Sequence, residues 1–339
     1  MMSDRTPLVS HDGPIRWGIV GTGNIAKIFA RDMPLAEGAE LVAVGSRSQE
    51  AADVFGEMFD VPRRYSSYEG IIDDPDIDVV YVATPHPMHH DITIKLLNAG
   101  KNVLCEKPMA MNVAETREMI AAARENGRFL MEAVWTRFRP AMVKVREFIQ
   151  DGTLGEIQYM TVNMGWNNPY DPAFRLYNKD LGGSALLDAG VYAVQMVQMV
   201  LGEPVEMVSV ATLGDSEVDE NCMITTRHAN GAVANAGITV RANSRNLAMI
   251  AGTKGSIVMD HDWHRPSTFT LFENGKDPEF FDCSHEGIGY QYEMMEVGKC
   301  LREGLTEHPV MPLDDTLMVA QIMQDAIRSW GVTYPYDRD

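Results

Sequence analysis

A strand that runs directly into a glycine-rich turn constrains the fold of this chain more than any other feature. The apolar run "IRWGIV" (residues 15–20) is typical of a buried strand, and "GTGNIA" follows it before a stretch with helical spacing. Glycines at such a turn let the backbone approach a pyrophosphate, and the free N–H groups at a helix N-terminus attract its charge. The segment therefore predicts a dinucleotide-binding unit. The residues expected to contact the cofactor are Gly21, Thr22, Gly23, Asn24 and Ile25.

Short apolar runs continue to alternate with amphipathic stretches up to about residue 135. This rhythm is typical of a parallel sheet with helices on both faces, that is, an α/β Rossmann domain. Ligands of an open α/β sheet lie at the carboxyl ends of its strands. The ends of "VVYVAT" and "KNVLCEK", and the helix after the first of them, add further residues to the expected cofactor groove: Ala83, Thr84, His86, His89, Glu106 and Lys107.

The end of the second strand, "AELVAVGSRS", bears on which dinucleotide is bound. An NAD enzyme usually carries Asp or Glu here to hold the ribose 2′-hydroxyl, whereas this chain has Ser46 and Arg47. A hydroxyl followed by a guanidinium suits a 2′-phosphate, because Arg forms charge-assisted bonds with phosphate oxygens. The alternative is a solvated Arg47 at the start of the next helix. NADP is therefore favoured, and NAD remains possible.

A lysine stands at the end of the strand "KNVLCEK", between Glu106 and Pro108. Pro108 restricts Lys107 to extended geometry and permits a cis peptide bond, so the direction of the amine is restricted. An ordinary solvated surface lysine is the alternative interpretation. Its place on the ligand-bearing edge of the sheet favours a positioned, functional lysine.

The second half of the chain has a different pattern. Alternating segments such as "IQYMTVNMGW" and "CMITTRHANGAVANAGITV" are separated by turn residues, which predicts an α+β domain with a large, mainly antiparallel open sheet. We expect a tail over residues 1–13, a Rossmann domain over 14–135 and a substrate-binding and oligomerisation domain over 136–339. A broad sheet needs its open face covered, so a homodimer or a dimer of dimers is expected.

One helix is predicted from about Ser184 to just before Gly202. Asp188 and Tyr192 are four residues apart and would share a side of a regular helix, and the carboxylate needs a partner in apolar surroundings. They form either a structural hydrogen-bonded pair or a catalytic one. The preceding loop is aromatic and rich in amides, which suits a polyol, although ordinary surface packing explains it equally well. Its candidate substrate-binding residues are Trp166, Asn167, Asp171, Phe174 and Arg175.

The composition of the chain limits the classes of molecule that it is expected to bind. A formal net charge of -19 argues against nucleic acid and anionic membranes as partners and favours small molecules. The four cysteines lie far apart in the sequence, and neither an export signal nor a membrane span is recognisable, which indicates a cytoplasmic protein. His86, His89 and His90 match no zinc spacing, so no metal site is expected.

Read in order, "GTGNIA", "ATPHPMHH", "AGKNVLCEKPMAMN", "MEAVWTRFRP" and "LGGSALLDAGVYAVQMV" resemble the glucose-fructose oxidoreductase, inositol dehydrogenase and MocA family. The later motifs look like its branch of dimeric dihydrodiol dehydrogenases and NADP-dependent D-xylose dehydrogenases. The resemblance implies that Lys107 lies beside the nicotinamide and the substrate, that Tyr192 transfers the proton, and that Asp188 completes the catalytic set. It also places Trp135, Arg137 and Phe138 near the nicotinamide end, the first two toward the cofactor and the third toward the substrate. Ser184 departs from an expected glycine.

The resemblance implies an NADP-dependent oxidoreductase that moves a hydride between the nicotinamide and a secondary alcohol or carbonyl of a sugar, polyol or cyclic trans-diol. Two alternatives stay open. Some relatives use the nicotinamide transiently to cleave a glycoside without net redox change, and a non-catalytic protein that senses NADP(H) would bind the cofactor and turn nothing over. The presence of Lys107, Asp188 and Tyr192 together argues against a sensor, which needs no proton-transfer groups.

Overall fold

The predicted parallel sheet is present and has six strands, β1 to β6, in the spatial order β3-β2-β1-β4-β5-β6. Every neighbouring pair is parallel. The central strands β4 and β5 are buried along their whole length, as a sheet covered on both faces requires. The strand bounds are Ile15–Val20 (β1), Ala39–Gly45 (β2), Arg63–Tyr65 (β3), Val79–Val82 (β4), Asn102–Glu106 (β5) and Leu130–Ala133 (β6).

This sheet belongs to the first of two units in the computed structural model, which describes residues 6–337. Unit 1 comprises the chain up to Trp135 together with Glu286–Thr316, and unit 2 comprises Thr136–His285 and the chain from Leu317 onward. Part of the expected tail, residues 1–5, lies outside the described residues, as do residues 338 and 339.

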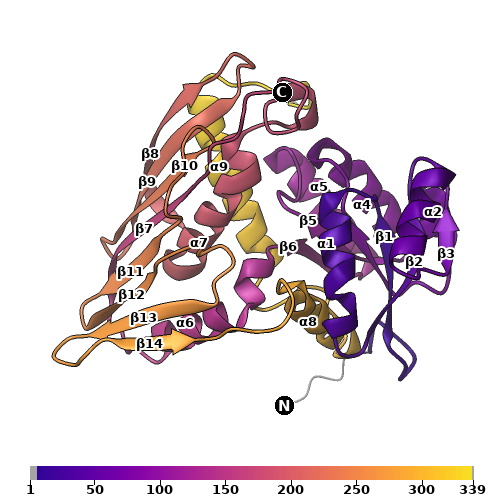
Figure 1. Ribbon diagram of the computed structural model, residues 1–339, viewed down its shortest axis with the longest axis horizontal. Coiled ribbons are helices and arrows are strands. Elements are labelled where there is room, and N and C mark those ends of the chain that lie inside the picture. Colours follow the sequence, from indigo (N-terminus) through magenta and orange to yellow (C-terminus); the bar gives the residue numbers. More distant parts are fainter. Residues whose placement is uncertain (1–5, 338–339) are drawn as a thin grey trace. The chain divides into compact units, whose positions relative to one another are not determined.

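The helices of unit 1 include one that comes from far along the sequence. α4 and α5 pack against each other, and α1 packs against α8 (Figure 1). The bounds are Asn24–Asp32 (α1), Met33–Leu35 (η1), Gln49–Met58 (α2), Glu69–Asp73 (α3), His86–Met88 (η2), His89–Asn98 (α4), Val113–Asn126 (α5) and Tyr290–Arg302 (α8).

Segment Glu286–Thr316 is where the domain division expected from chain order differs from the structure. The Asp32 carboxylate at the end of α1 accepts hydrogen bonds from the backbone N–H groups of Ile288, Gly289 and Tyr290, at 2.7–3.1 Å. A carboxylate at this position caps the N-terminus of α8 and complements its dipole. The buried contacts of α8 therefore belong to unit 1, although the segment follows most of unit 2 in the sequence.

Unit 2 contains the predicted mainly antiparallel sheet. Its eight strands lie in the order β14-β13-β12-β11-β7-β10-β9-β8, and within this sheet only β7 and β10 pair in parallel. Asn230-Gly231 forms the predicted turn between β9 and β10, with Gly231 at a φ of 86°. The bounds are Ile157–Gly165 (β7), Pro204–Leu213 (β8), Asp219–His228 (β9), Val233–Thr239 (β10), Ala248–Gly252 (β11), Gly255–Met259 (β12), Thr268–Glu273 (β13) and Glu279–Asp282 (β14).

Helices cover one face of this sheet and leave the other open (Figure 1). On the open face Val208 is 62% exposed, Val210 69% and Met223 44%. The helical segments are Trp135–Phe138 (η3, which begins at the last residue of unit 1's first segment), Pro140–Gln150 (α6), Lys179–Leu181 (η4), Leu186–Gly190 (η5), Val191–Leu201 (α7) and Leu313–Ser329 (α9, in unit 2 from Leu317).

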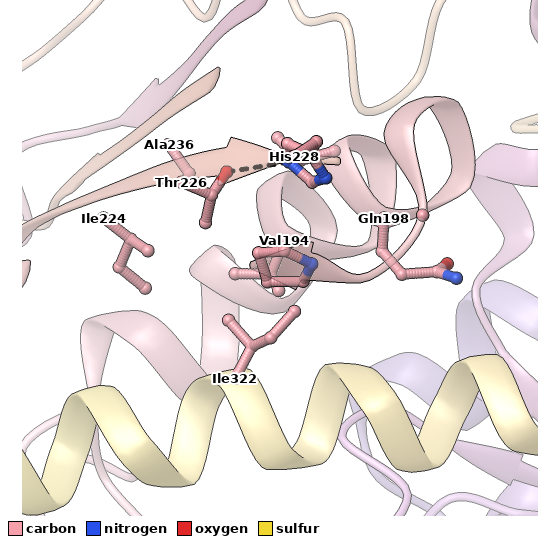
Figure 2. Close-up of a pocket in the computed structure, with 10 residues that line it drawn as sticks. Val194, Gln198, Ile224, Thr226, His228, Ala236 and Ile322 are labelled. Carbon is pink, nitrogen blue, oxygen red and sulfur yellow. Dashed lines mark hydrogen bonds between the residues drawn. The ribbon is translucent and has the colours of Figure 1, made fainter. Parts of the chain in front are cut away.

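The stretch Lys179–Leu201, which contains α7, is long and apolar enough to cross a membrane by length and composition alone. However, 78% of its most apolar window is buried inside the protein, as expected for a core helix. A small pocket of about 10 Å³ lies beside α7, lined among others by Val194, His228 and Ile322 (Figure 2). It has room for about one water molecule, so it is too small to bind a sugar or a diol.

Candidate active site

The glycine turn after β1 has the geometry that a pyrophosphate requires. Gly21 has a φ of 102°, and a Cβ atom there would lie 2.8 Å from the carbonyl oxygen of Ala83, so only glycine fits without strain. Gly23 caps α1 without a side-chain hydrogen bond, and open space surrounds the position that its Cβ would take. The N–H groups of the first turn of α1 therefore face an unobstructed surface. These features fit a bound dinucleotide phosphate.

The carboxyl ends of the neighbouring strands complete this surface. The hydroxyl oxygens of Thr22 and Ser46 lie 3.4 Å apart, after β1 and β2, and Arg47 is exposed. After β4, the Thr84 hydroxyl is buried and has no hydrogen-bond partner among the described residues. A buried polar atom without a partner at the ligand-bearing edge of a sheet also fits a cofactor that would supply one.

The His89 ring contacts the backbone of the turn that follows β5 and carries Lys107. Its ring is fully buried, with Nε2 2.8 Å from the carbonyl oxygen of Thr84 and Nδ1 2.9 Å from that of Pro108. Burial lowers the pKa of His89, and the two carbonyl contacts oppose this shift. The histidine thus links the turn after β4 to the turn after β5. A contact between His89 and the cofactor stays a prediction.

Lys107 lies in the turn after β5 and is partly exposed, whereas its neighbours in the sequence are buried. The peptide bond between Lys107 and Pro108 is cis. Of residues 101–113, Lys107 is the one that is not buried. Glu106, expected beside the cofactor, is instead 5% exposed; it accepts hydrogen bonds from the Tyr81 hydroxyl and from the backbone N–H of Lys107. These two donors place Glu106 as a support of the turn, and its contact with a cofactor stays a prediction.

In unit 2, the helix that carries Asp188 and Tyr192 begins irregularly. Ser184 accepts a hydrogen bond from the backbone N–H of Leu187, so it caps the helix as predicted. Residues Leu186–Gly190, however, form a π-helical turn before α7. The prediction that Asp188 and Tyr192 share one side of the helix assumed a regular α-helix; with the wider turn between them it stays a prediction. Such turns are frequent at functional sites.

Asp188 has the partner that its burial requires. Arg175 Nη1 lies 2.7 Å from Asp188 Oδ1, and Nη2 lies 3.2 Å from Oδ2, a bidentate pair. Arg175 is half exposed on the loop before the helix, whereas Asp188 is 9% exposed. The guanidinium thus compensates the charge of the buried carboxylate.

Tyr192 is partly exposed on α7 and faces a histidine that sequence reasoning missed. The rings of Tyr192 and His264 have centroids 6.0 Å apart. The Thr136 hydroxyl donates a hydrogen bond to the His264 carbonyl oxygen, and Arg139 Nε donates one to the carbonyl oxygen of Pro266 at 3.1 Å. This loop has no pattern of its own in the sequence, so only its contacts identify it.

The segment Trp135–Phe138, expected near the nicotinamide end, has buried side chains, and its contact with cofactor and substrate stays a prediction. Arg137 is 2% exposed, and its Nη2 donates to the Gln195 and Gln198 side chains of α7 at 2.6 and 2.8 Å. Its guanidinium therefore fastens η3 to α7. The Trp135 ring stacks on Tyr290 of α8 with centroids 4.4 Å apart, and Phe138 is buried.

The remaining predicted substrate residues lie on the loop between β7 and the helix. Trp166 is partly exposed, and Asn167, Asp171 and Phe174 are exposed. The Asp171 carboxylate accepts a hydrogen bond from the Ala173 backbone, and Asn167 N–H donates to Asn243. Their role in substrate binding stays a prediction.

Over residues 6–337 there is no cluster of three or more His, Cys, Asp or Glu side chains that could hold a metal ion. His90 lies between the carboxylates of Asp91 and Glu118, at 2.8 and 2.7 Å. His89 and His90 therefore both have hydrogen-bond partners within the protein.

A six-stranded parallel sheet with a glycine turn after β1 and open space at the start of α1 is the architecture of a dinucleotide-binding Rossmann domain. The sequence matches the family model described as "Oxidoreductase family, NAD-binding Rossmann fold" over residues 15–134, and the "GFO/IDH/MocA C-terminal domain" over residues 142–258. The chain belongs to the GFO/IDH/MocA family, and the predicted fold class and family are confirmed.

Relatives and solved structures agree with this class. The chain is 40% identical over 333 residues to trans-1,2-dihydrobenzene-1,2-diol dehydrogenase of Xenopus laevis, covering 94% of this chain and 99% of the relative. It is similar to levoglucosan dehydrogenase in complex with NADH and levoglucosan (TM-score 0.85, 26% identity, 95% and 100% covered). It is also similar to KijD10, a 3-ketoreductase from Actinomadura kijaniata in complex with NADP and TDP-benzene (TM-score 0.81, 26% identity, 94% and 98% covered). The protein is an NAD(P)-dependent dehydrogenase or reductase that acts on alcohol groups.

Proposed function

We propose that this protein is an NADP-dependent oxidoreductase that transfers a hydride between the nicotinamide and a secondary alcohol or carbonyl of a sugar, polyol or cyclic trans-diol. The observation that carries the proposal is the turn after β5, where Lys107 alone emerges from residues 101–113 while His89 and Glu106 hold the turn from within. A purely structural turn has no need to present an ammonium group at the ligand-bearing edge. The relatives' names, a dihydrodiol dehydrogenase and a levoglucosan dehydrogenase, support vicinal hydroxyl compounds as the substrate class.

Residues of the protein must accept the proton that leaves the substrate hydroxyl during oxidation, and return it during reduction. The nicotinamide, when bound, accepts or gives the hydride. Tyr192 takes the proton of the substrate hydroxyl, and Lys107 donates a hydrogen bond to the same oxygen and favours ionisation of the phenol, because a nearby cation stabilises a phenolate. Asp188, held by Arg175, orients the tyrosine. The loop of Trp166, Asn167, Asp171 and Phe174 binds the substrate's other hydroxyl groups.

NADP is the proposed cofactor, ahead of NAD. Ser46 and the exposed Arg47 follow β2, where an acidic residue would otherwise receive a ribose 2′-hydroxyl. The neighbours bind either form, NADH in levoglucosan dehydrogenase and NADP in the 3-ketoreductase. The preference therefore depends on this chain's own hydroxyl and guanidinium.

We further propose that the open face of the unit 2 sheet forms a homodimer or dimer-of-dimers contact and that the protein acts in the cytoplasm. The exposed Val208, Val210 and Met223 support the first statement, because contiguous exposed apolar side chains mark association surfaces. The four cysteines are all free thiols, which supports a reducing compartment.

The test follows nicotinamide absorbance with NADP⁺ and with NAD⁺ across aldoses, inositols and cyclic trans-diols. We expect turnover with NADP⁺ that Lys107→Ala abolishes, and an increase in KM for NADP⁺ but not for NAD⁺ in Arg47→Ala. Glycoside cleavage without net absorbance change, or tight cofactor binding without turnover of any panel member, contradicts the proposal.

A further inference from the structure

A second glutamate lies buried in unit 1, on the helix that returns from the end of the chain. Glu293 of α8 is fully buried, and neither of its carboxylate oxygens has a hydrogen-bond partner among the described residues. An ionised carboxylate in such surroundings is very costly, because burial removes its hydration and no hydrogen-bond donor of the described residues replaces it. The group is therefore expected to hold a proton.

Aromatic contacts show which residues pack against the face of α8 that carries Tyr290 and Glu293. Tyr290, one helical turn before Glu293, meets the Phe29 ring edge-on with centroids 6.2 Å apart. Phe29 in turn stacks on Tyr81 of β4 at 3.8 Å. Tyr81 donates its hydroxyl hydrogen bond to Glu106, the residue before Lys107. Glu293 thus belongs to the same closed compartment as Tyr81 and Glu106.

The two carboxyl groups of this compartment are not equivalent. Glu106 accepts hydrogen bonds from the Tyr81 hydroxyl and the Lys107 backbone N–H, whereas Glu293 accepts none from the described residues. Hydrogen bonds to a carboxylate favour its charged form, and two neighbouring carboxylates in a dry site disfavour double ionisation. Burial raises the pKa of Glu293 well above its ordinary value, and the charge on Glu106 raises it further. Burial also raises the pKa of Tyr81 well above its ordinary value, so this phenol stays neutral and adds no charge.

We propose that Glu293 is a positioning residue that stays neutral, so that the compartment's single negative charge remains on Glu106, directly behind Lys107. The inference rests on the proposed role of Lys107 in proton transfer. A charged Glu106 makes its hydrogen bonds with the Tyr81 hydroxyl and the Lys107 backbone N–H charge-assisted, so the turn that carries Lys107 keeps one conformation. The neutral acid also supplies a dipole beside Glu106 in surroundings that are otherwise aromatic and apolar.

The charge state is tested first, without any need for turnover. Infrared difference spectra of the full-length protein at pH about 8 compare wild type with Glu293→Gln, and with Glu303→Gln, an exposed residue just past α8, as the matched control. We expect the carbonyl stretch of a protonated carboxylic acid in wild type and in the Glu303 variant and its loss in Glu293→Gln. A band that persists in Glu293→Gln overturns the proposal.

Stability against pH gives a second, independent readout. A raised folded pKa means that Glu293 contributes less to stability as pH rises from the ordinary range of a glutamate, about 4 to 5, toward that folded pKa. Glu293→Gln has no such proton to lose, so its unfolding temperature relative to wild type should rise between pH about 5 and pH about 8. An unfolding temperature that keeps a constant difference over this range contradicts a neutral Glu293.

The positioning role is tested by pH profiles of kcat/KM for wild type, Glu293→Leu and Glu293→Gln. Leucine removes the dipole of the neutral acid, so Glu106 should lose its charge more easily, the turn that carries Lys107 should be held less firmly, and the acidic limb of the profile should move to higher pH by about one unit. Glutamine should restore the wild-type limb. If the three profiles coincide, Glu293 has only a structural role and the positioning role is overturned. Turnover by the wild-type enzyme tests the proposed function separately.

Discussion

The two sheets of this protein use their edges and faces in different ways. The parallel sheet of unit 1 is buried on both faces, so its chemistry is confined to the carboxyl ends of its strands, where the glycine turn, Thr84 and Lys107 emerge. The sheet of unit 2 is covered on one face only, and the proposed catalytic groups Asp188 and Tyr192 lie on its covering helix, with His264 beside Tyr192. A doubly covered sheet thus exposes only its strand ends, whereas a singly covered sheet also has an exposed apolar face.

The largest expected effect tests whether the chemistry of unit 2 resides on its covering helix. Tyr192→Phe removes the proposed proton-transfer group and should lower kcat by about 10²–10⁴-fold, with cofactor affinity kept. Steady-state kinetics and cofactor titration measure the two quantities, and Tyr159→Phe, on β7, is the control. Retention of kcat in Tyr192→Phe would transfer the proton role to Lys107.

The next effect concerns the cofactor edge of unit 1. Gly21→Ala places a Cβ atom 2.8 Å from the Ala83 carbonyl oxygen at a φ of 102°, so we expect a loss of about 1–3 kcal/mol in the free energy of unfolding and weaker NADP⁺ binding. Chemical denaturation and cofactor titration measure these changes. Gly13→Ala, where the new Cβ would lie 3.4 Å from His11, should change stability little. Full cofactor affinity in Gly21→Ala is incompatible with the proposed phosphate-binding turn.

The free face of unit 2 gives a smaller expected effect. Val210→Asp puts a carboxylate among the exposed apolar side chains and should weaken self-association at least about tenfold, equivalent to about 1.4 kcal/mol. Light scattering over a range of protein concentrations measures the association. Val54→Asp, which is similarly exposed on α2, is the control. Equal association of both variants would show that the open face is not the contact.

The smallest expected effect lies at the opposite edge of the parallel sheet. Burial would raise the pKa of Asp78, but hydrogen bonds from the Arg16 side chain and backbone and from His11 lower it below its ordinary value. A lowered folded pKa adds stability that is present above the ordinary pKa and is lost as pH falls through the folded one. Asp78→Asn should therefore lose about 1 kcal/mol at neutral pH and match wild type in strong acid, with kcat unchanged. A change in kcat would show that this edge is not purely structural.

The sequence predicted the elements whose local signals agree with their tertiary surroundings. Gly21 at the end of β1, the lysine turn after β5 and the Asn230-Gly231 hairpin all lie where expected, because each signal is carried by adjacent residues. The π-helical turn at Asp188 was not predictable, since nothing in "LLDAG" distinguishes it from an ordinary helix start.

The residues that sequence analysis did not single out were missed for one reason. Each makes its important contacts with residues that are distant in the sequence. His264 lies near Tyr192 only because Thr136 and Arg139 hold its loop, and Glu293 lies in a stretch that reads as a plain amphipathic core helix. The hydrogen bonds of the Arg137 guanidinium with Gln195 and Gln198 were not predictable for the same reason, and the contact with the cofactor that the resemblance implies stays a prediction. Sequence spacing locates a side chain along an element and leaves open which distant group it meets.

The contacts that Asp32 makes with α8 can form only late in synthesis, because α8 is among the last elements of the chain to be made. By the time the ribosome has added Trp135, all six strands of unit 1 exist, yet the helix that Asp32 caps lies more than a hundred residues ahead, at Tyr290–Arg302. Until that helix arrives, Phe29 and Tyr81 lack the Tyr290 side of their aromatic cluster, and Glu106 lacks the buried neighbour proposed here. The nucleotide-binding unit therefore matures only near the end of synthesis, and a fragment that stops at residue 135 should behave as an unfinished folding intermediate rather than as an independent cofactor-binding module.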